Sequence, residues 1–136
     1  MTAAKARERF AAARVARLAT AGADGRPHIV AVVFAVDGDR VYSVVDAKPK
    51  RSPQLRRLAN VRANPAVSLL VDHYEEDWDA LWWARADGCG RVLAPRDAEA
   101  VHAVALLAAR YPRQRAVGEV LAVDVTRWSG WAARRS

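Results

Sequence analysis

A run of positive side chains between residues 47 and 64 is the part of the sequence best suited to bind an anion. The run reads AKPKRSPQLRRLANVRAN and contains no acidic residue. Ser52 and Pro53 predict a helix start in its middle, because serine caps helices and proline fits the first helical position. A helix start presents free backbone N–H groups and the positive end of a dipole. The run therefore predicts a phosphate or carboxylate site, and a solvated basic face is the alternative.

Other kinds of site find little support in the sequence. The three histidines and Cys89 do not lie at metal-ligand spacing, and the acidic loop of residues 72–79 is more simply a solvated loop than a cation site. No nucleophile motif, phosphate loop or dinucleotide fingerprint occurs. We therefore predict no metal and leave the catalytic residues unknown. Any difficult chemistry is expected to come from a cofactor that the protein binds and orients.

Size and composition predict a single domain over residues 1–136. The hydrophobic fraction of 52% argues against disorder. The sequence shows no secretion signal, has one cysteine, and has no apolar run near the roughly 18 residues that span a bilayer, so we expect a cytoplasmic protein without a membrane partner. The net charge of +7 indicates an anionic partner, although an arginine-rich composition alone would also produce it.

The elements that must position these residues are short strands with a few helices. Asp-Gly turn signals at residues 24–25 and 37–39 separate the first strands, and the apolar segment 28–36 is expected to be one strand covered on both faces. Short strands with tight turns predict a mainly β fold, a small closed barrel with peripheral helices. We expect helices over residues 2–13, 53–63 and 95–110, and strands over residues 15–21, 28–36, 40–45, 66–71, 80–86 with 90–93, and 119–126.

The segment from Arg17 to Val92 resembles the pyridoxamine 5′-phosphate oxidase-like (PPOX-class) split β-barrel proteins. The motifs L-A-T…D-G-x-P and N-x-R-x-N-P-x-V-S-L are common to that superfamily. The more specific motifs D-x-K-P-K-R and D-W-x-x-L-W-W are similar to its actinobacterial branch of F420-dependent oxidoreductases. The resemblance implies a six-stranded, FMN-binding type of split barrel that forms a homodimer, with the cofactor at the dimer interface.

The resemblance also implies which residues hold the cofactor. The end of the third strand would lie near the ring system, through the backbone of Val44, Val45 and Asp46. The cofactor phosphate would be bound by side chains of the following loop and helix, namely Lys48, Lys50, Arg51, Arg56 and Arg57. The partner subunit would close the site with two adjacent tryptophans, Trp82 and Trp83. Neighbouring strand residues face opposite sides, so one of these tryptophans is expected in a core and the other at a ligand or a partner.

The number of cations favours one cofactor over another. FMN has one phosphate, whereas the deazaflavin coenzyme F420 has a phosphodiester and a tail of glutamate carboxylates, which would occupy five cations more fully. The expected reaction is hydride transfer to an electron-poor double bond of an unidentified small molecule. An FMN-dependent oxidoreductase of the same fold and a non-catalytic binder of a cofactor or nucleic acid are the alternatives. Nucleic acid is less favoured, because the tryptophans do not lie along the basic run.

Overall fold

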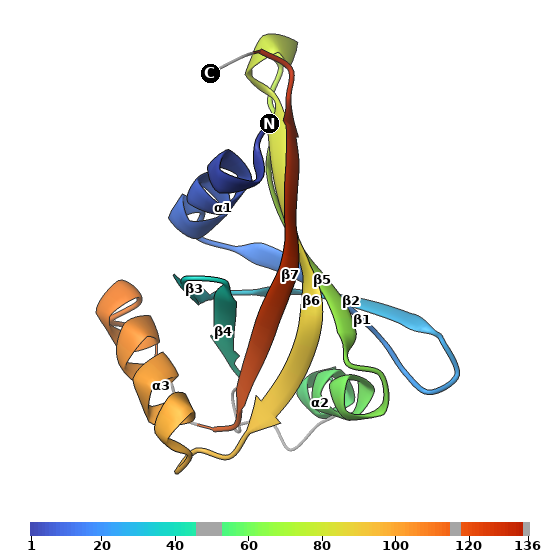
Figure 1. The fold of residues 1–136 in the computed structure, drawn as a ribbon, viewed down its shortest axis with the longest axis vertical. Coiled ribbons are helices and arrows are strands. Elements are labelled where there is room, and N and C mark those ends of the chain that lie inside the picture. Colours follow the sequence, from blue (N-terminus) through green and yellow to red (C-terminus); the bar gives the residue numbers. More distant parts are fainter. Residues whose placement is uncertain (46–52, 115–117, 135–136) are drawn as a thin grey trace.

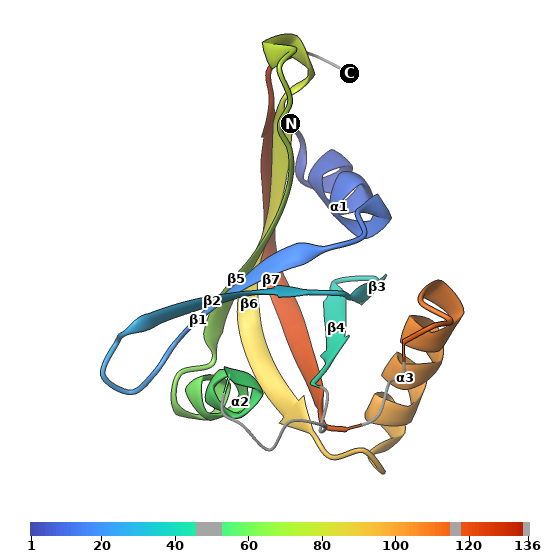
Figure 2. The ribbon, with the colours of Figure 1, turned by 180° about the vertical axis from the view of Figure 1, so that it is seen from behind.

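The computed structural model describes residues 1–45, 53–114 and 118–134, and for residues 53–55 it describes the backbone only. Seven strands form one antiparallel sheet in the order β2-β1-β5-β6-β7-β4-β3 (Figures 1 and 2). The elements in chain order are α1 (Ala3–Ala12), β1 (Ala16–Ala21), β2 (Pro27–Val32), β3 (Ala35–Asp37), β4 (Arg40–Val44), α2 (Pro53–Ala63), β5 (Ala66–His73), the short 3-10 helix η1 (Trp78–Ala80), β6 (Trp82–Leu93), α3 (Ala98–Arg110) and β7 (Val120–Ala132).

The predicted mainly β fold with peripheral helices is confirmed, and so are its local signals. Gly25 and Gly38 have positive φ angles of 78° and 61° in the two predicted turns. The N-terminal helix begins after Thr2, whose side chain accepts a hydrogen bond from Lys5 N. No ladder joins β2 to β3 within the described ranges, so the sheet is split rather than closed.

The apolar segment 28–36 was expected as one strand covered on both faces, and this prediction is wrong. The chain forms β2 and then β3, which lie at opposite ends of the strand order, so the sheet has seven strands rather than six. Ile29 on the edge strand β2 is 67% exposed, so this strand is not covered on both faces. Apolar composition predicts a strand but does not say where the sheet ends.

The strand that was expected in two parts, over residues 80–86 and 90–93, is one continuous strand, β6 (Trp82–Leu93). Its register against β7 shifts between Asp87 and Gly88, which is a β-bulge rather than a break. β7 also continues to Ala132, beyond the predicted residue 126, so the tryptophans of the C-terminal segment lie in the sheet. Long mutual pairing of β6 and β7 explains both extensions, since each strand satisfies the backbone groups of the other.

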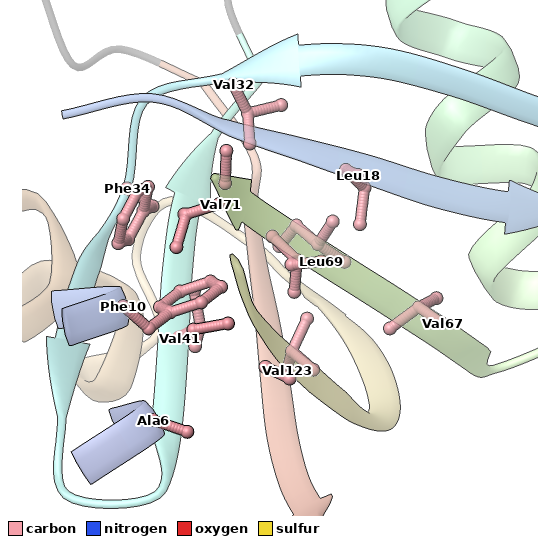
Figure 3. Packing of buried hydrophobic residues seen from close by; sticks show 14 of the residues in the cluster. Ala6, Phe10, Leu18, Val32, Phe34, Val41, Val67, Leu69, Val71 and Val123 are labelled. Carbon is pink, nitrogen blue, oxygen red and sulfur yellow. The ribbon is translucent and has the colours of Figure 1, made fainter. Parts of the chain in front are cut away.

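The main core lies between the curled sheet and α1 (Figure 3). Phe10 of α1 is fully buried, and its ring centroid lies 4.9 Å from Phe34 and 5.3 Å from Trp128. α3 covers a second, smaller core through Ala100 and Ala103, which pack with Tyr42 of β4. The two helices thus hold the sheet curled. The third helix, α2, packs beside the end of β1 that leads to β2 and the end of β6 that leads to α3.

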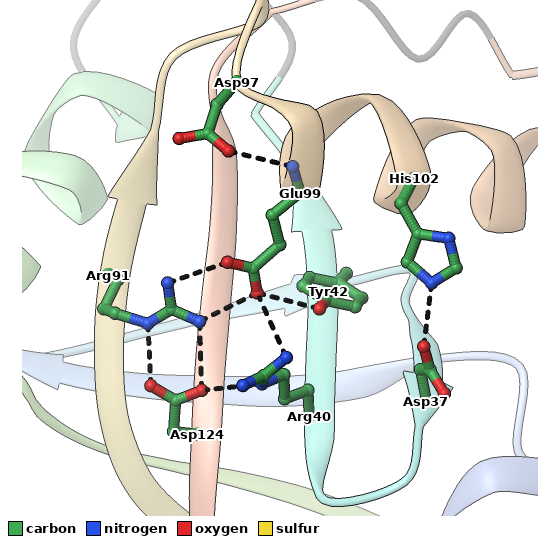
Figure 4. Close-up of polar contacts among 8 residues, drawn as sticks. All are labelled: Asp37, Arg40, Tyr42, Arg91, Asp97, Glu99, His102 and Asp124. Atoms are coloured by element: carbon green, nitrogen blue, oxygen red, sulfur yellow. Dashed lines mark hydrogen bonds and ion pairs between the residues drawn. The ribbon is translucent and has the colours of Figure 1, made fainter.

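A network of charged side chains fastens α3 to the sheet (Figure 4). Glu99 accepts hydrogen bonds from both terminal nitrogens of Arg91, at 2.9 and 2.8 Å, and from Tyr42 Oη at 2.8 Å. Arg91 also bonds Asp124, which pairs with Arg40. Hydrogen bonding to Arg91 lowers the pKa of Glu99 from 4.5 to about 2. Since these charges are mutually paired, we interpret the network as structural.

The network predicts a specific acid sensitivity. A carboxyl group with a lowered pKa in the folded state stabilises the fold above its unfolded pKa, and this stabilisation is lost as the pH falls toward the folded pKa. Glu99→Gln should lower the free energy of unfolding by about 1–2 kcal/mol at pH 7, and should remove part of the loss of stability between pH 4.5 and 2. Urea unfolding across this pH range measures both effects.

The matched control for this experiment is Glu8→Gln, because Glu8 is exposed on α1 and its pairing with Lys5 is a surface contact at 3.6 Å. This control should retain the pH profile of the wild type. An unchanged profile for Glu99→Gln would contradict the assigned role of the carboxylate.

Candidate functional site

The helix α2 is the described part of the basic run, and it begins at Pro53 as predicted. It packs against β1 and β6 through Leu58 and Val61, which are buried. The approach to β6 is close, since a Cβ atom at Gly90 would lie 2.9 Å from Val61 Cγ1. The first turn of α2 has no acidic residue. Its N-terminal end is therefore electropositive, as the sequence predicts.

Arg57 lies on the packed side of α2 and is only 7% exposed. Its Nε atom is buried and has no hydrogen-bond partner among the described residues. Burial lowers the pKa of Arg57, although arginine remains protonated. A buried charge without a counter-ion is costly, so proteins almost always pair such groups. The position of Arg57 thus favours binding of an anion, and this is the feature of the described structure that best fits a phosphate-bearing cofactor.

A second group of polar side chains with buried atoms lies where α2 packs on β1 and on the neighbouring strand β2. Asn60, one turn after Arg57, donates from Nδ2 to Thr20 Oγ1 at 3.0 Å. His28 is paired with Thr20 across β1 and β2, and its Nδ1 atom is buried without a partner among the described residues. Sequence reasoning missed these residues. The i, i+3 spacing of Arg57 and Asn60 was the available signal that both share one helix face.

The end of β4 and the start of β7 meet beside α2. Val45 N donates to Glu119 O at 2.9 Å, and Arg62 Nη2 bonds Glu119 Oε2 at 2.8 Å. Val44 and Val45, the residues predicted near the ring system, therefore lie on a strand end that Glu119 ties to the basic helix. Arg62 already has an acidic partner, whereas Arg56 is exposed.

The loop that carries the other predicted contacts lies outside the described residues. This applies to the proposed cap Ser52 and to four predicted cofactor contacts: Asp46, Lys48, Lys50 and Arg51. Of the predicted cations, Arg56 and Arg57 are described, and they are adjacent on α2 with very different exposure.

Trp82 and Trp83 face opposite sides of the sheet, as predicted. Trp82 packs against the main core and stacks with His73, at 6.5 Å between ring centroids. Trp83 lines a pocket on the other face of the sheet. Both lie at the start of β6, the end remote from α2 (Figure 1), since the eight residue steps from Trp82 to Gly90 span about 27 Å of strand. One chain therefore does not bring the tryptophans to the basic helix.

Other candidate groups are placed as follows. Cys89 is exposed on β6. His73 and His102 bond to Glu75 and Asp37 on the surface. Within residues 1–45, 53–114 and 118–134, no group of three or more His, Cys, Asp or Glu side chains is placed to hold a metal ion. None of the helices in these ranges is long and apolar enough to cross a membrane.

Comparisons with known proteins agree with this architecture. A family model described as pyridoxamine 5′-phosphate oxidase matches residues 2–132. No protein of curated function matches the chain. Three similar solved structures show the same fold. A conserved hypothetical protein from Mycobacterium tuberculosis has 22% identity over 98% of this chain and 86% of its own, with a TM-score of 0.74.

The second structure is an FAD-binding protein from Mesorhizobium loti, with 23% identity over 96% of this chain and 94% of its own and a TM-score of 0.72. The third is HutZ, the heme storage protein from Vibrio cholerae, with 16% identity over 97% and 94% of the two chains and a TM-score of 0.69. At these identities the likeness concerns the fold.

The burial of Arg57, whose Nε has no partner among the described residues, predicts an unusual effect of mutation. Arg57→Met retains most of the side-chain volume and removes a desolvated charge, so the free energy of unfolding should rise by about 1 kcal/mol in the absence of ligand. The control Arg56→Met, at an exposed position, should change it by less than about 0.5 kcal/mol. Urea unfolding of the three proteins measures this. Clear destabilisation by Arg57→Met would instead identify a structural partner for the guanidinium.

Proposed function

Because the chain belongs to the pyridoxamine 5′-phosphate oxidase family, we propose that it is an oxidoreductase that holds a flavin-type cofactor. The single observation that carries this proposal is Arg57, a buried guanidinium whose Nε has no partner among the described residues. A cofactor phosphate beside α2 would supply a hydrogen-bond acceptor for this Nε and a negative charge for the guanidinium. The basic, acid-free start of this helix supports the same placement.

The finer proposal is that the cofactor is the deazaflavin coenzyme F420, as in the actinobacterial branch that the sequence resembles. Arg57 is suited to the phosphodiester because it is desolvated, and charge-assisted bonds are strongest in such surroundings. The exposed Arg56, together with Lys48, Lys50 and Arg51 of the preceding loop, would bind the glutamate tail. One FMN phosphate would leave several of these five cations without a partner.

The complete site is proposed to form between two copies of the chain. Trp83 lies at the far end of β6 from α2, so it can close a cofactor site only on a partner subunit. β2 is an edge strand with an exposed Ile29, while η1 carries the exposed Trp78 and β7 the exposed Trp131. Burying such apolar area is what a homodimer interface does.

The proposed reaction is the transfer of a hydride from the reduced cofactor to an electron-poor double bond of a small molecule, which also takes up one proton from water. The protein's own contribution is to bind and orient. The cations fix the phosphate end, and the backbone at Val44, Val45 and Asp46 positions the ring system. No side chain is assigned a proton-transfer role.

Two related functions are the alternatives. The FAD-binding proteins among the similar structures favour a flavin oxidoreductase, and in an FMN-dependent one the same cations would hold a single phosphate. HutZ, a storage protein, favours binding without turnover. Binding of nucleic acid is distinguished from both by a steep dependence on salt concentration.

The test is a titration with full-length F420 and with F420 trimmed of its glutamates, followed by cofactor fluorescence. Arg57→Ala should weaken binding of both forms by roughly 10-fold or more, since about 1.4 kcal/mol corresponds to tenfold and Arg57 is proposed to bind the phosphodiester. Adding Lys50→Ala should weaken the full-length form further and the trimmed form much less. An FMN titration of the same variants tests the first alternative.

The control for these titrations is Arg96→Ala, which removes an exposed charge from the loop before α3. It should bind both forms as the wild type does. Equal affinity of wild type and double variant for both forms would mean that the basic run is only a solvated face.

A further inference from the structure

A pocket of about 300 Å³ lies on the outer face of the sheet, at the end remote from α2. It is lined by Leu70, Asp72 and Tyr74 from β5 and the loop after it, and by Trp83 and Arg85 from β6. The ladder pairs Leu70 with Arg85 and Asp72 with Trp83. The intervening residues Val71 and Ala84 point into the core, so the five lining side chains share the opposite face.

Arg85 is held in one orientation from two sides. Its Nε donates to Asp87 Oδ2 at 3.0 Å, and the other carboxylate oxygen of Asp87 accepts a hydrogen bond from Ser68. The guanidinium carbon lies 5.6 Å from the centroid of the Trp83 ring, which adds a cation–π contact. Within the described chain no acceptor is bonded to Nη1 or Nη2 of Arg85. These two nitrogens form a fixed fork at the pocket, the geometry that binds a carboxylate through both oxygens.

The remaining walls define the rest of the ligand. Trp83, Tyr74 and Leu70 offer aromatic and aliphatic surface, which suits a planar, conjugated molecule. Asp72 lies two residues along β5 from Leu70, the ladder partner of Arg85, which is about 7 Å of strand. Its carboxylate would repel a second acidic group on the ligand. A hydroxyl or N–H group at that end of the ligand would donate a hydrogen bond to the carboxylate of Asp72.

We propose that this pocket binds an aromatic or conjugated carboxylic acid, with its carboxylate on Arg85 and a hydrogen-bond donor toward Asp72. The assignment of this acid as the hydride acceptor rests on the proposed function, whereas its binding does not. A double bond conjugated with a carboxyl group is electron-poor, as a hydride acceptor must be. If Trp83 closes the cofactor site of the partner subunit, as proposed above, the pocket would lie beside that cofactor.

The probe is 4-hydroxycinnamate, which has a carboxylate, a conjugated double bond and a hydroxyl donor in one plane. Calorimetric titration of the protein without cofactor, to about 1 mM ligand, should show binding. The neutral 4-hydroxycinnamamide should bind at least 10-fold more weakly, because it lacks the charge for Arg85. The 4-methoxy analogue should bind several-fold more weakly, because it has no donor for Asp72.

Substitutions of the residues that line or orient the pocket test whether the ligand binds there. Arg85→Gln should weaken 4-hydroxycinnamate by 10-fold or more, and Arg85→Lys by less, because it retains charge but not the fork. Asp87→Asn, which loosens the orientation of Arg85, should give an intermediate loss. Arg96→Gln is the control for net charge and should bind normally. The indole N–H resonance of Trp83 in the NMR spectrum, which is identified by its loss in Trp83→Phe, should shift on titration. This shift reports binding independently of activity.

Each result decides between clear outcomes. Equal binding of acid and amide, or an affinity unaffected by Arg85→Gln in a folded variant, overturns the proposal. Failure of the acid to bind a protein that does bind F420 overturns the pocket and leaves the proposed function intact. Arg85-dependent binding of the acid by a protein that binds neither F420 nor FMN supports the pocket and rejects the proposed function.

Discussion

The antiparallel pairing of β6 with β7 is the constraint on which the rest of the structure depends. Twelve registered pairs run from Trp82 with Ala132 to Leu93 with Val120, with a single shift at Asp87 and Gly88. A Cβ atom at Gly88 would lie 2.2 Å from Asp124 O, so the bulge requires glycine. β5 pairs with β6 and β4 with β7, and all three helices pack on this central pair or on the strands beside it.

This long pair also separates two chemically different regions. At one end, α2 and the strand end of β4 form a basic region around a desolvated arginine. At the other, Trp83 and Arg85 form an aromatic pocket with a fixed guanidinium. Because β6 is too long for these regions to meet within one chain, a site that uses both requires a second copy. The network around Glu99 takes no part in either region and holds α3 in place.

The sequence predicted those features that depend on neighbouring residues. The two glycine turns, the helix start at Pro53 and the basic character of α2 follow from local chemistry, and the motifs near Asn60 indicated the family. The edge position of β2, the burial of Arg57 and the pocket at Arg85 depend on partners distant in sequence. An arginine on a helix gives no sign of whether it faces water, and strand register cannot be obtained from alternation alone.

Native mass spectrometry of the protein mixed with FMN and, separately, with F420 measures assembly and cofactor choice together. We expect the mass of a dimer carrying up to two F420 molecules, and weaker occupancy by FMN, since only F420 has enough negative groups for the five cations of the basic run. A monomer that retains neither cofactor at micromolar concentration would contradict both the shared site and the proposed chemistry.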